Sequence, residues 1–500
     1  MNRTKKLALN TFTSLIKQFV SVICGFILPR LFLLQYGSSV NGLVSSITQV
    51  LSLISIFDAG MGVVIEASLY EPLAKKNSKR INQVMTSGQR FYRVFVFILA
   101  IYVAIISLIY PLVVNEFDFI FTFTLIVSIS ISSFGQYCFG VTSSVLLSAD
   151  QKSYINFIAY AITNVANTVI GVVLIKLNCS VQIVKLVSSL IYIIRPIYLS
   201  LYVNKNYKIN WHEEYSEEPI KQKWNGMAQH IAALVVGNTD IVVLTTFSTL
   251  KNVSIYSVYF LVINSVKEII NASSAGIKSL LGNMLAKHEQ NKLQNAFSLM
   301  EWGMHMIIIL LFSMTAILVA PFIKLYTRGV NDINYDMPIF GLLLSVAYAI
   351  FCLRIPYFTV IQAAGHFKET QRSAIIEAII NIVVSIIAVF KYGIIGVACG
   401  TIIAMLYRLI YFIAYLSSNI LKRKVVIFIK LILFDIVIFI IIFISCKFVN
   451  FECKSYFQWM ILSVKCMIVG IVELVIFNLI FYNKNLVLSY KVLISKLKRK

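Results

Sequence analysis

Charged residues are scarce in this 500-residue chain, and acidic residues are the scarcest of them. Asp, Glu, Lys and Arg together make up 13% of the sequence, whereas soluble domains carry about 25%. Only 21 residues are acidic and 44 are Lys or Arg, so the formal net charge is +23. Hydrophobic residues make up 59% of the chain. This balance argues against the series of soluble domains that the length alone would suggest.

The motifs of the common enzyme families are also missing. The sequence has no Walker A loop, no dinucleotide-binding glycine fingerprint and no GxSxG nucleophile motif. None of its eight cysteines forms a CxxC pair, and the run His212-Glu213-Glu214 does not match the HExxH pattern of a zinc site. We therefore predict that the protein is not an enzyme and that it holds no cofactor and no metal ion.

What the chain contains instead is a series of long apolar runs. Their lengths of roughly 18 to 25 residues are sufficient for an α-helix to cross the hydrocarbon core of a bilayer. Strands of a membrane barrel would alternate between apolar and polar residues, and these runs do not. We predict an all-α polytopic membrane protein with about fourteen transmembrane helices. The expected spans are 11–36, 42–66, 91–113, 119–147, 154–177, 181–203, 228–248, 253–280, 297–323, 337–362, 373–391, 393–416, 425–447 and 457–482.

The basic residues are concentrated in alternate connections between these spans. One set of connections contains the segment 75–80, the linker around 204–227 and the C-terminal tail, whereas the opposite set is short and has few cations. Because cytoplasmic loops carry an excess of Lys and Arg, we predict a multi-pass protein of the cytoplasmic membrane with both termini in the cytoplasm. The cations are spread over many short connections, so we do not expect nucleic acid as a partner.

The chain contains two related halves. Arg195 and its neighbours match Arg408 and its neighbours, which lie 213 positions later. Each half contains six of the expected spans, so both copies have the same orientation, as in a parallel repeat about an axis along the membrane normal. We expect a six-helix bundle over 1–216, a second six-helix bundle over 217–420, and two additional helices with a basic cytoplasmic tail over 421–500.

Charged side chains inside the apolar spans are the candidates for function. An unpaired charge at the centre of a bilayer costs roughly 3 kcal/mol on insertion scales, so such residues should face protein or water. Structural pairing between helices explains any single one of them about as well as function does, but it explains the whole set poorly. The residues expected to line a substrate cavity are Arg30, Asp58, Arg195, Asp240, Lys267, Arg354 and Arg408.

Cations outnumber carboxylates in this set. Several cations around a cavity fit a phosphate or diphosphate group, which accepts paired hydrogen bonds from a guanidinium. We expect Arg30, Lys267 and Arg354 to hold that group. Lys267 and Glu268 are adjacent and lie about 100° apart on a helix, so one of them could pair with Asp240 while the other faces the cavity.

Short motifs follow one another in order along the first twelve spans, and together they carry a family resemblance. With them, the chain resembles the Wzx-type polysaccharide flippases of the multidrug/oligosaccharidyl-lipid/polysaccharide (MOP) exporter superfamily. The motifs are Phe57-Asp-Ala-Gly-Met-Gly62, Leu69-Tyr-Glu-Pro-Leu-Ala-Lys75, Leu147-Ser-Ala-Asp-Gln-Lys152, Asn238-Thr-Asp-Ile-Val-Val-Leu244, Val253-Ser-Ile-Tyr-Ser-Val-Tyr259, Ala364-Gly-His-Phe-Lys368 and Gly393-Ile-Ile-Gly-Val-Ala-Cys-Gly-Thr401.

The resemblance implies a fold and a function. It implies two six-helix bundles around a central cavity and two extra helices. It also implies that polyprenyl-diphosphate-linked oligosaccharide moves from the inner to the outer leaflet by alternating access, for surface polysaccharide synthesis. Arg30 and Asp58 fall where family members commonly place cavity charges. The implied partners are the lipid-linked substrate, the bilayer, a coupling ion (H⁺ or Na⁺) and a polysaccharide polymerase.

Two other functions remain open from the sequence. One is a small-molecule (multidrug) exporter of the same superfamily, which would carry cations and would favour a cavity lined with carboxylates. The other is a membrane glycan polymerase, which would need a large folded loop with an acidic catalytic pair. The external loop near 328–336 contains carboxylates but is too short to enclose a sugar.

Overall fold

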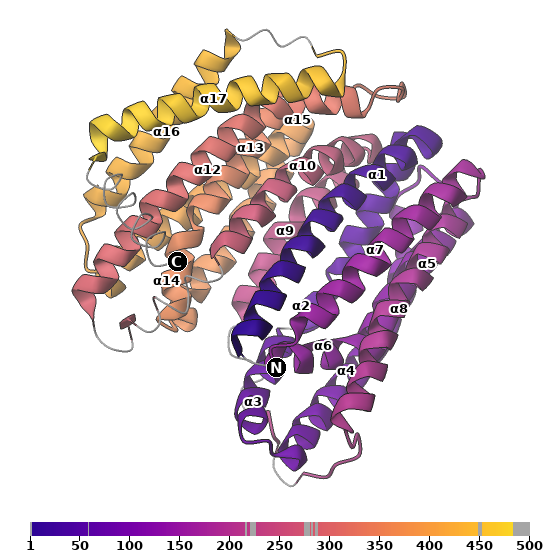
Figure 1. Ribbon diagram of the computed structural model, residues 1–500. Coiled ribbons are helices and arrows are strands. Elements are labelled where there is room, and N and C mark those ends of the chain that lie inside the picture. Colours follow the sequence, from indigo (N-terminus) through magenta and orange to yellow (C-terminus); the bar gives the residue numbers. More distant parts are fainter. Residues whose placement is uncertain are drawn as a thin grey trace. The chain divides into compact units, whose positions relative to one another are not determined.

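The computed structural model describes residues 3–58, 60–215, 218–220, 227–274, 281, 284–285, 289–448 and 453–483. These residues are almost entirely helical, and none of them lies in a β-strand. The chain forms two compact units, residues 1–254 and 255–500, whose helices are labelled in Figure 1. The predicted basic tail beyond residue 483 lies outside the described residues, as do residues 216–217 and 221–226 of the predicted linker.

Unit 1 consists of helices and a few short turns. Its elements are α1 (Arg3–Ser52), α2 (Ser55–Asp58), α3 (Met61–Ala74), α4 (Ser78–Val113), α5 (Phe119–Gly135), the π-helix η1 (Gln136–Gly140), α6 (Val141–Ala149), α7 (Ser153–Lys176), α8 (Val181–Tyr207), α9 (Met227–Phe247) and the first residues of α10 (Leu250–Ser274).

Unit 2 contains the rest of α10 and the later helices. These are α12 (Gln290–Tyr326), α13 (Pro338–Leu353), α14 (Ile355–Ala363), α15 (Phe367–Tyr415), the π-helix η2 (Leu416–Ile420), α16 (Val425–Lys447) and α17 (Tyr456–Phe481).

Eleven helices of the described chain are long and apolar enough to cross a membrane. Two of them, Leu9–Ser52 and Lys368–Ile420, would be about 66 and 80 Å long if they were straight, which is too long for one crossing. Each folds back at a glycine. When the two limbs of each of these helices are counted separately, the eleven spans become thirteen crossings, and the second limb of the first helix continues into α2 and α3. The shorter apolar helix Ile231–Phe247 adds the fourteenth crossing. The fold class predicted from the sequence is therefore confirmed.

Helix α1 reverses direction at Gly37. This glycine has φ 80° and ψ 175°, a backbone conformation that residues with a Cβ rarely adopt. Before Gly37, α1 runs beside α7 in the same direction. Lys6 contacts Asp150 just before α7 begins, and the Tyr36 hydroxyl donates to the carbonyl oxygen of Cys179 just after α7 ends.

After Gly37 the chain runs antiparallel to α9. The hydroxyl oxygens of Ser46 and Thr245 lie 2.6 Å apart. Closer to the bend, the two backbones approach so tightly that a Cβ on Gly42 would lie 1.8 Å from the carbonyl oxygen of Leu250. Only glycine fits this approach, which fixes the register of the second limb of α1 against the start of α10.

Helix α15 is a hairpin folded at Gly393. This residue has φ 55° and ψ −133°, and the two limbs then run side by side. The Asn381 side chain donates to the Thr401 hydroxyl across the hairpin over 3.2 Å. A Cβ on Gly396 would lie 2.2 Å from a backbone carbonyl oxygen of the other limb. Small residues at this contact let the limbs approach closely, as in other membrane helix pairs.

Helix α12 is the centre of unit 2. It packs against α13, α14, α16 and α17, and two thirds of its most apolar segment is buried. The C-terminal helices α16, orange in Figure 1, and α17, yellow, lie along α12 and against each other. Trp302 of α12 donates to Asn478 of α17 over 2.8 Å. The C-terminal pair is therefore joined to the interior of unit 2.

Candidate functional site

Two arginines and a glutamate form an ion-pair cluster inside unit 2. Arg354 lies between α13 and α14, Glu377 on the first limb of α15 and Arg408 on the second limb. One carboxylate oxygen of Glu377 pairs with the Arg354 guanidinium, and the other lies 3.6 Å from Nε of Arg408. None of the three side chains is more than 14% exposed. One buried carboxylate therefore serves two cations.

The local sequence explains why Arg354 interrupts a helix. Pro356 has no N–H to donate to the carbonyl oxygen of Cys352, and in a continuous helix its ring would clash with that carbonyl group. Helix α13 ends at Leu353, and α14 begins after Arg354. The guanidinium carbon of Arg354 lies 4.3 Å from the ring centroid of Phe351, one turn earlier. The break thus points a cation toward the limbs of α15 while an aromatic ring supports it.

Arg408 ties the two limbs of α15 together. Its guanidinium donates to the Ser373 hydroxyl over 2.7 Å and lies 4.5 Å from the ring centroid of Phe412. With the contact to Glu377, the guanidinium is held by a hydroxyl, a carboxylate and an aromatic face. The residue is 4% exposed, so these contacts replace the water that a surface arginine would have.

Lys267 reaches the same region through an aromatic ring. Its Nζ lies 5.6 Å from the centroid of Phe351, the ring that also contacts Arg354. The same Nζ lies 3.3 Å from a carboxylate oxygen of Glu268. Lys267 and Glu268 therefore pair with each other, because both side chains are long enough to curve toward one another. Their separation around the helix did not predict this pair. The structure thus groups Lys267, Arg354 and Arg408, with three cations and two carboxylates.

In unit 1, Asp58 is linked to the wall of a pocket. The Tyr92 hydroxyl on α4 donates to the Asp58 carboxylate over 2.9 Å. Tyr92 stacks on Tyr137 with ring centroids 6.1 Å apart. Both tyrosines line a pocket of about 500 Å³. Asp58 is therefore positioned by a side chain that a molecule in this pocket would touch.

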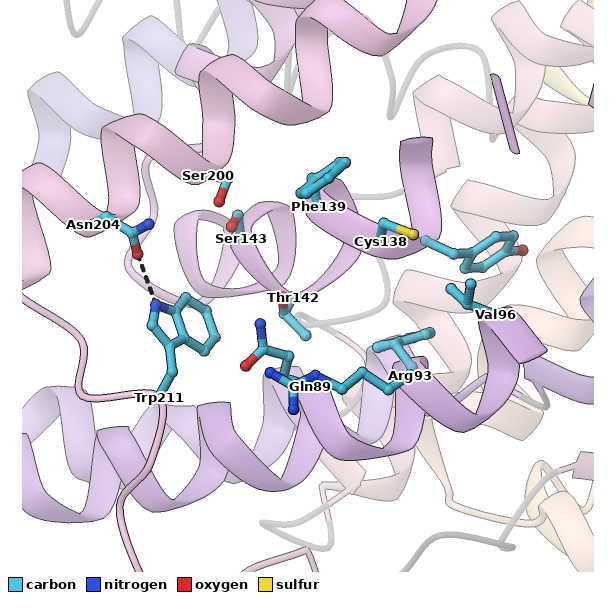
Figure 2. A pocket seen from close by; sticks show the side chains of 12 residues that line it. Gln89, Arg93, Val96, Cys138, Phe139, Thr142, Ser143, Ser200, Asn204 and Trp211 are labelled. Atoms are coloured by element: carbon cyan, nitrogen blue, oxygen red, sulfur yellow. Dashed lines mark hydrogen bonds between the residues drawn. The ribbon is translucent and has the colours of Figure 1, made fainter. Parts of the chain in front are cut away.

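The pocket has a mixed polar and aromatic lining, shown in Figure 2. The Trp211 indole closes one side and donates to the Asn204 side chain over 2.9 Å. Amides, hydroxyls, a guanidinium and an indole can all bind a small polar ligand. The lining residues are Gln89, Tyr92, Arg93, Val96, Tyr137, Cys138, Phe139, Thr142, Ser143, Ser200, Asn204 and Trp211.

Arg195 has neutral partners. It donates to the Gln136 side chain in η1 over 2.7 Å and lies 5.4 Å from the ring centroid of Tyr160. Shifted by 213 positions, Tyr160 corresponds to Ser373, which contacts Arg408 in the second half. The two matched arginines therefore contact matched positions, but only Arg408 also has a carboxylate partner.

Arg30 and Asp240 also lie in unit 1. Arg30 follows Pro29 in the first limb of α1 and is half-buried. Asp240 in α9 is 3% exposed, so its carboxylate is shielded from lipid, as the cost of a lipid-facing charge requires. Two residues earlier, Asn238 accepts a 2.7 Å hydrogen bond from Ser52.

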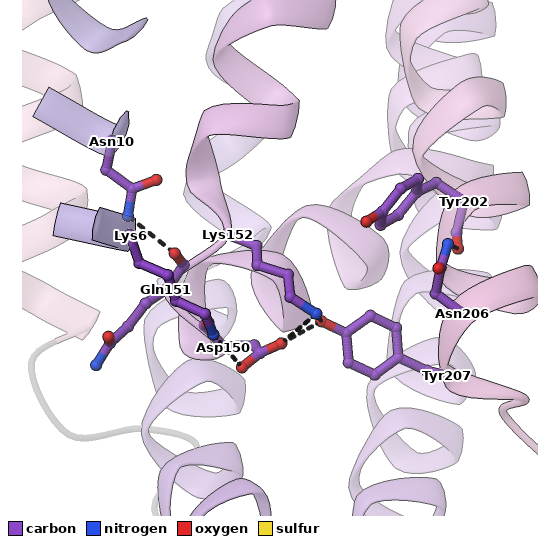
Figure 3. Close-up of polar contacts among 8 residues, drawn as sticks. All are labelled: Lys6, Asn10, Asp150, Gln151, Lys152, Tyr202, Asn206 and Tyr207. Atoms are coloured by element: carbon purple, nitrogen blue, oxygen red, sulfur yellow. Dashed lines mark hydrogen bonds and ion pairs between the residues drawn. The ribbon is translucent and has the colours of Figure 1, made fainter. Parts of the chain in front are cut away.

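A second polar cluster joins three helix ends of unit 1 (Figure 3). The Asp150 carboxylate, just after α6, lies 3.0 Å from Nζ of Lys6, 2.8 Å from Nζ of Lys152 and 2.5 Å from the Tyr207 hydroxyl. Burial alone would raise the pKa of Asp150, but hydrogen bonds from Lys152, Tyr207 and Lys6 outweigh it and lower that pKa below its ordinary value. The Asp150 cluster therefore fastens the starts of α1 and α7 to the end of α8.

Sequence reasoning missed a buried network in unit 2. His305 on α12 is fully buried, with Nδ1 2.6 Å from Asp435 on α16 and Nε2 3.0 Å from the Tyr357 hydroxyl on α14. One turn earlier on α12, Glu301 pairs with Arg423 at 2.6 Å. The signal was present in the sequence, because Glu301 and His305 lie four residues apart on one helix face within an apolar run.

Solved structures provide the comparison that identifies the fold. The lipid II flippase MurJ in an inward closed conformation matches with a TM-score of 0.68 and 17% identity, over 95% of this chain and 99% of that chain. An inward-facing multidrug resistance MATE family transporter of the MOP superfamily matches with a TM-score of 0.64 and 13% identity, over 81% and 96%. A mutant of the Vibrio cholerae MATE transporter VcmN matches with a TM-score of 0.59 and 11% identity, over 84% and 100%.

The chain shares the fold of the MurJ flippase and of the MATE transporter of the MOP superfamily. At these identities the likeness concerns the fold. No family model matches the sequence, and none of the curated proteins matches it. The Wzx-type resemblance therefore rests on the motifs alone.

The MurJ and MATE structures differ in the share of this chain that they cover. The MATE structures cover 81–85% of this chain. Residues 421–500, which contain α16 and α17, are 80 of 500 residues, or 16% of the chain. The MurJ match leaves only 5% of the chain uncovered, so it must include most of this C-terminal segment. The helices α16 and α17, and not only the first twelve spans, therefore have a counterpart in the MurJ structure.

Proposed function

We propose that this protein moves polyprenyl-diphosphate-linked oligosaccharide units from the inner to the outer leaflet of the cytoplasmic membrane, for synthesis of a surface polysaccharide. The observation that carries the proposal is the grouping of Lys267, Arg354 and Arg408 around two carboxylates, Glu268 and Glu377, inside the described membrane-spanning helices. The match to a lipid II flippase over 95% of the chain supports a lipid-linked substrate. Transport by alternating access, a coupling ion and a polymerase that consumes the product belong to the same proposal.

Glu377 gives this cluster a way to bind and release a phosphate. Without substrate, its carboxylate compensates part of the charge of Arg354 and Arg408, which lowers the free energy of burying the two cations inside the protein. A diphosphate offers more negative charge and pairs of oxygens that match a guanidinium. It would replace Glu377 at one arginine, and the carboxylate would take the arginine back when the diphosphate leaves.

Export of small cationic molecules is the second candidate. The observation that favours it is Asp58 beside Tyr92 and Tyr137 at the unit 1 pocket, because carboxylates and aromatic faces attract cations. Arg93 in the lining of the same pocket opposes this function. The MATE neighbours, which are multidrug resistance transporters, supply the precedent.

The test is transport in liposomes that contain the purified full-length protein. The probe is a fluorescent polyprenyl-diphosphate disaccharide, and its leaflet is read with a membrane-impermeant quencher. We expect the wild-type protein to exchange the probe between leaflets, Arg354→Ala and Arg408→Ala to slow the exchange, and Lys292→Ala to leave it unchanged. Lys292 forms an exposed ion pair with Glu289 and serves as the matched surface control. Movement of a fluorescent organic cation, but not of the lipid-linked probe, would establish the second candidate instead.

A further inference from the structure

We propose that His305, Asp435 and Tyr357 form a proton-binding site through which a proton gradient acts on transport. The inference deepens the proposed function, and its transport measurement rests on that function, whereas its proton-binding measurement does not. It also gives the C-terminal helix pair a role, because Asp435 lies on α16, outside the sequence repeat.

The geometry joins three helices through one imidazole ring. Nδ1 of His305 on α12 lies 2.6 Å from Oδ2 of Asp435, and Nε2 lies 3.0 Å from the Tyr357 hydroxyl on α14. His305 and Tyr357 are fully buried, and Asp435 is 2% exposed. Within the described part of unit 2, the other carboxylate oxygen of Asp435 has no hydrogen-bond partner. The negative charge on that buried oxygen is not compensated, so a positive charge on the neighbouring imidazole ring, made by adding one proton, is favoured.

Asp435 lies in the middle of α16, at the depth expected for a residue that relays protons through a membrane protein. Asp435 is close to the midpoint of α16 (Val425–Lys447), about 15 Å from its first residue. A permanent charge at this depth is expensive, and a group that can be neutralised by a proton avoids that cost part of the time. Chains of Asp, Glu and His at such depths are the usual means of moving protons through membrane proteins.

The charged and titratable groups around the ring leave one negative charge unbalanced. On α12, Glu301 faces the site but is paired with Arg423 at 2.6 Å. Tyr357 is on α14, Asp435 on α16, and Tyr482 follows α17 on the side of Asp435 and Glu301. With His305 neutral, the Glu301–Arg423 pair cancels and Asp435 remains. One bound proton makes the group neutral as a whole.

That proton reverses two hydrogen bonds. Before it binds, His305 donates Nδ1–H to Asp435 and accepts the Tyr357 hydroxyl hydrogen at Nε2. When the proton adds to the lone pair of Nε2, the new N–H donates to the Tyr357 oxygen. The hydroxyl hydrogen then turns toward the neighbouring Glu301 carboxylate. No other bond forms or breaks, and the net change is the gain of one H⁺.

The reversal acts on the helix that begins beside the cation cluster. Helix α14 is nine residues long, and Tyr357 lies one turn after Arg354, the residue that directly precedes the helix. A change in the partner of Tyr357 therefore shifts the segment that positions the Arg354 guanidinium against Glu377. Arg423 lies in the connection before α16, so the network runs from a helix end toward the interior and offers protons an entrance.

Proton binding is tested directly by infrared titration of the full-length protein in lipid. We expect a band of a protonated carboxyl or of imidazolium that changes with pH, is lost in Asp435→Asn and His305→Gln, and is kept in Trp302→Phe. Trp302→Phe is the matched control, because it removes a partly buried hydrogen bond between α12 and α17 that involves no titrating group. An unchanged titration in both Asp435→Asn and His305→Gln would overturn the proposal.

Coupling is tested in the liposome assay with an imposed pH gradient. The wild-type rate should increase severalfold with the gradient, and the rates of His305→Gln and Asp435→Asn should not respond to it while slow exchange persists. Tyr357→Phe keeps the ring packing, so it decides the matter if the other variants fold poorly, and it should lose most of the stimulation. A wild-type protein that exchanges the probe without any response to the gradient, or variants that respond fully, would refute the coupling. A wild-type protein that moves no lipid-linked probe would refute the proposed function but leave the infrared result to decide the proton site.

Discussion

At the scale of single residues, the buried charged side chains of this protein differ in the kinds of group that they contact. Arg195 contacts an amide and an aromatic ring, whereas Arg408 contacts a carboxylate. Glu377 and Asp150 each have more than one donor around a single carboxylate. Side chains held in this way are set in position before any ligand arrives, and they keep a charge stable in places where water is excluded.

Arg354 gives a prediction about transport. Arg354→Ala should lower the flipping rate about tenfold or more, because a charge-assisted hydrogen bond to the substrate is worth roughly 1.5–3 kcal/mol. Folding should survive, since Glu377 keeps Arg408 as a partner. Arg354→Lys should be partly active, because it retains the charge but not the planar pair of donors. The rate is measured in liposomes at matched protein amounts, and wild-type rates in Arg354→Ala would show that Arg354 has only a structural role.

Asp150 gives a prediction about pH. Its pKa is lowered in the folded protein by the hydrogen bonds from Lys152, Tyr207 and Lys6, which outweigh the effect of burial. A lowered pKa stabilises the fold at pH values above the ordinary pKa of Asp, and this stabilisation is lost as the pH falls through the folded value. Wild-type protein should therefore have a higher Tm than Asp150→Asn at pH 7, and the difference should shrink below about pH 4. A difference that grows in acid would contradict this assignment.

At the scale of helices, the close packing of the two limbs of the α15 hairpin depends on glycine. Gly396→Ala should destabilise the protein by about 1–3 kcal/mol, the usual range for overpacking, because the added Cβ meets a backbone carbonyl oxygen at 2.2 Å. Gly303→Ala in α12 is the control, since nothing lies within 4 Å of its added Cβ. The measurement is the Tm of each purified protein in detergent. Equal Tm values for the two variants would mean that the hairpin limbs can separate without cost.

The sequence was most informative about these helices and least informative about their partners. The expected spans 373–391 and 393–416 place a reversal at Gly393, where the folded chain has one. The expected span 42–66 is broken in the structure by turns at Leu53–Ile54 and at Gly60, on either side of the short helix α2, which the apolar run conceals. His305 and Asp435 are 130 positions apart, so no local pattern could pair them. The same holds for Arg354 and Arg408, whose shared carboxylate becomes visible only once α15 folds back.

At the scale of the whole molecule, the distribution of cations predicts the orientation in the membrane. In a variant without native cysteines, His212→Cys in the linker should react with an impermeant thiol reagent only after the cells are opened. Asn334→Cys, in the loop between α12 and α13, should react in intact cells. Both positions are exposed, so access to the thiol should depend only on the side of the membrane. The reverse labelling pattern would invert the topology.

The internal repeat remains a prediction at this scale. The domain boundaries at residues 216 and 420 are predicted from the sequence, whereas the boundary between the two compact units lies after Ser254 in the chain. The two boundaries differ because α9 packs against the second limb of α1, so packing does not follow the repeat. In an experimental structure, the first six crossings should superpose on the next six by rotation about the membrane normal. A superposition that requires inversion would rule out the parallel repeat.

The carboxylate shared by Arg354 and Arg408 also restricts the order in which these positions can change during evolution. Loss of Glu377 first would leave two buried cations without a counter-charge, each at a cost of roughly 3 kcal/mol if it faced hydrocarbon. Loss of either arginine first leaves the other still paired. Lineages should therefore pass through a state with one arginine before the glutamate disappears, and an acidic residue at 377 should be found wherever both cations are retained. We therefore expect the three positions to be inherited as a unit, although 23 residues separate Arg354 from Glu377 and 31 separate Glu377 from Arg408.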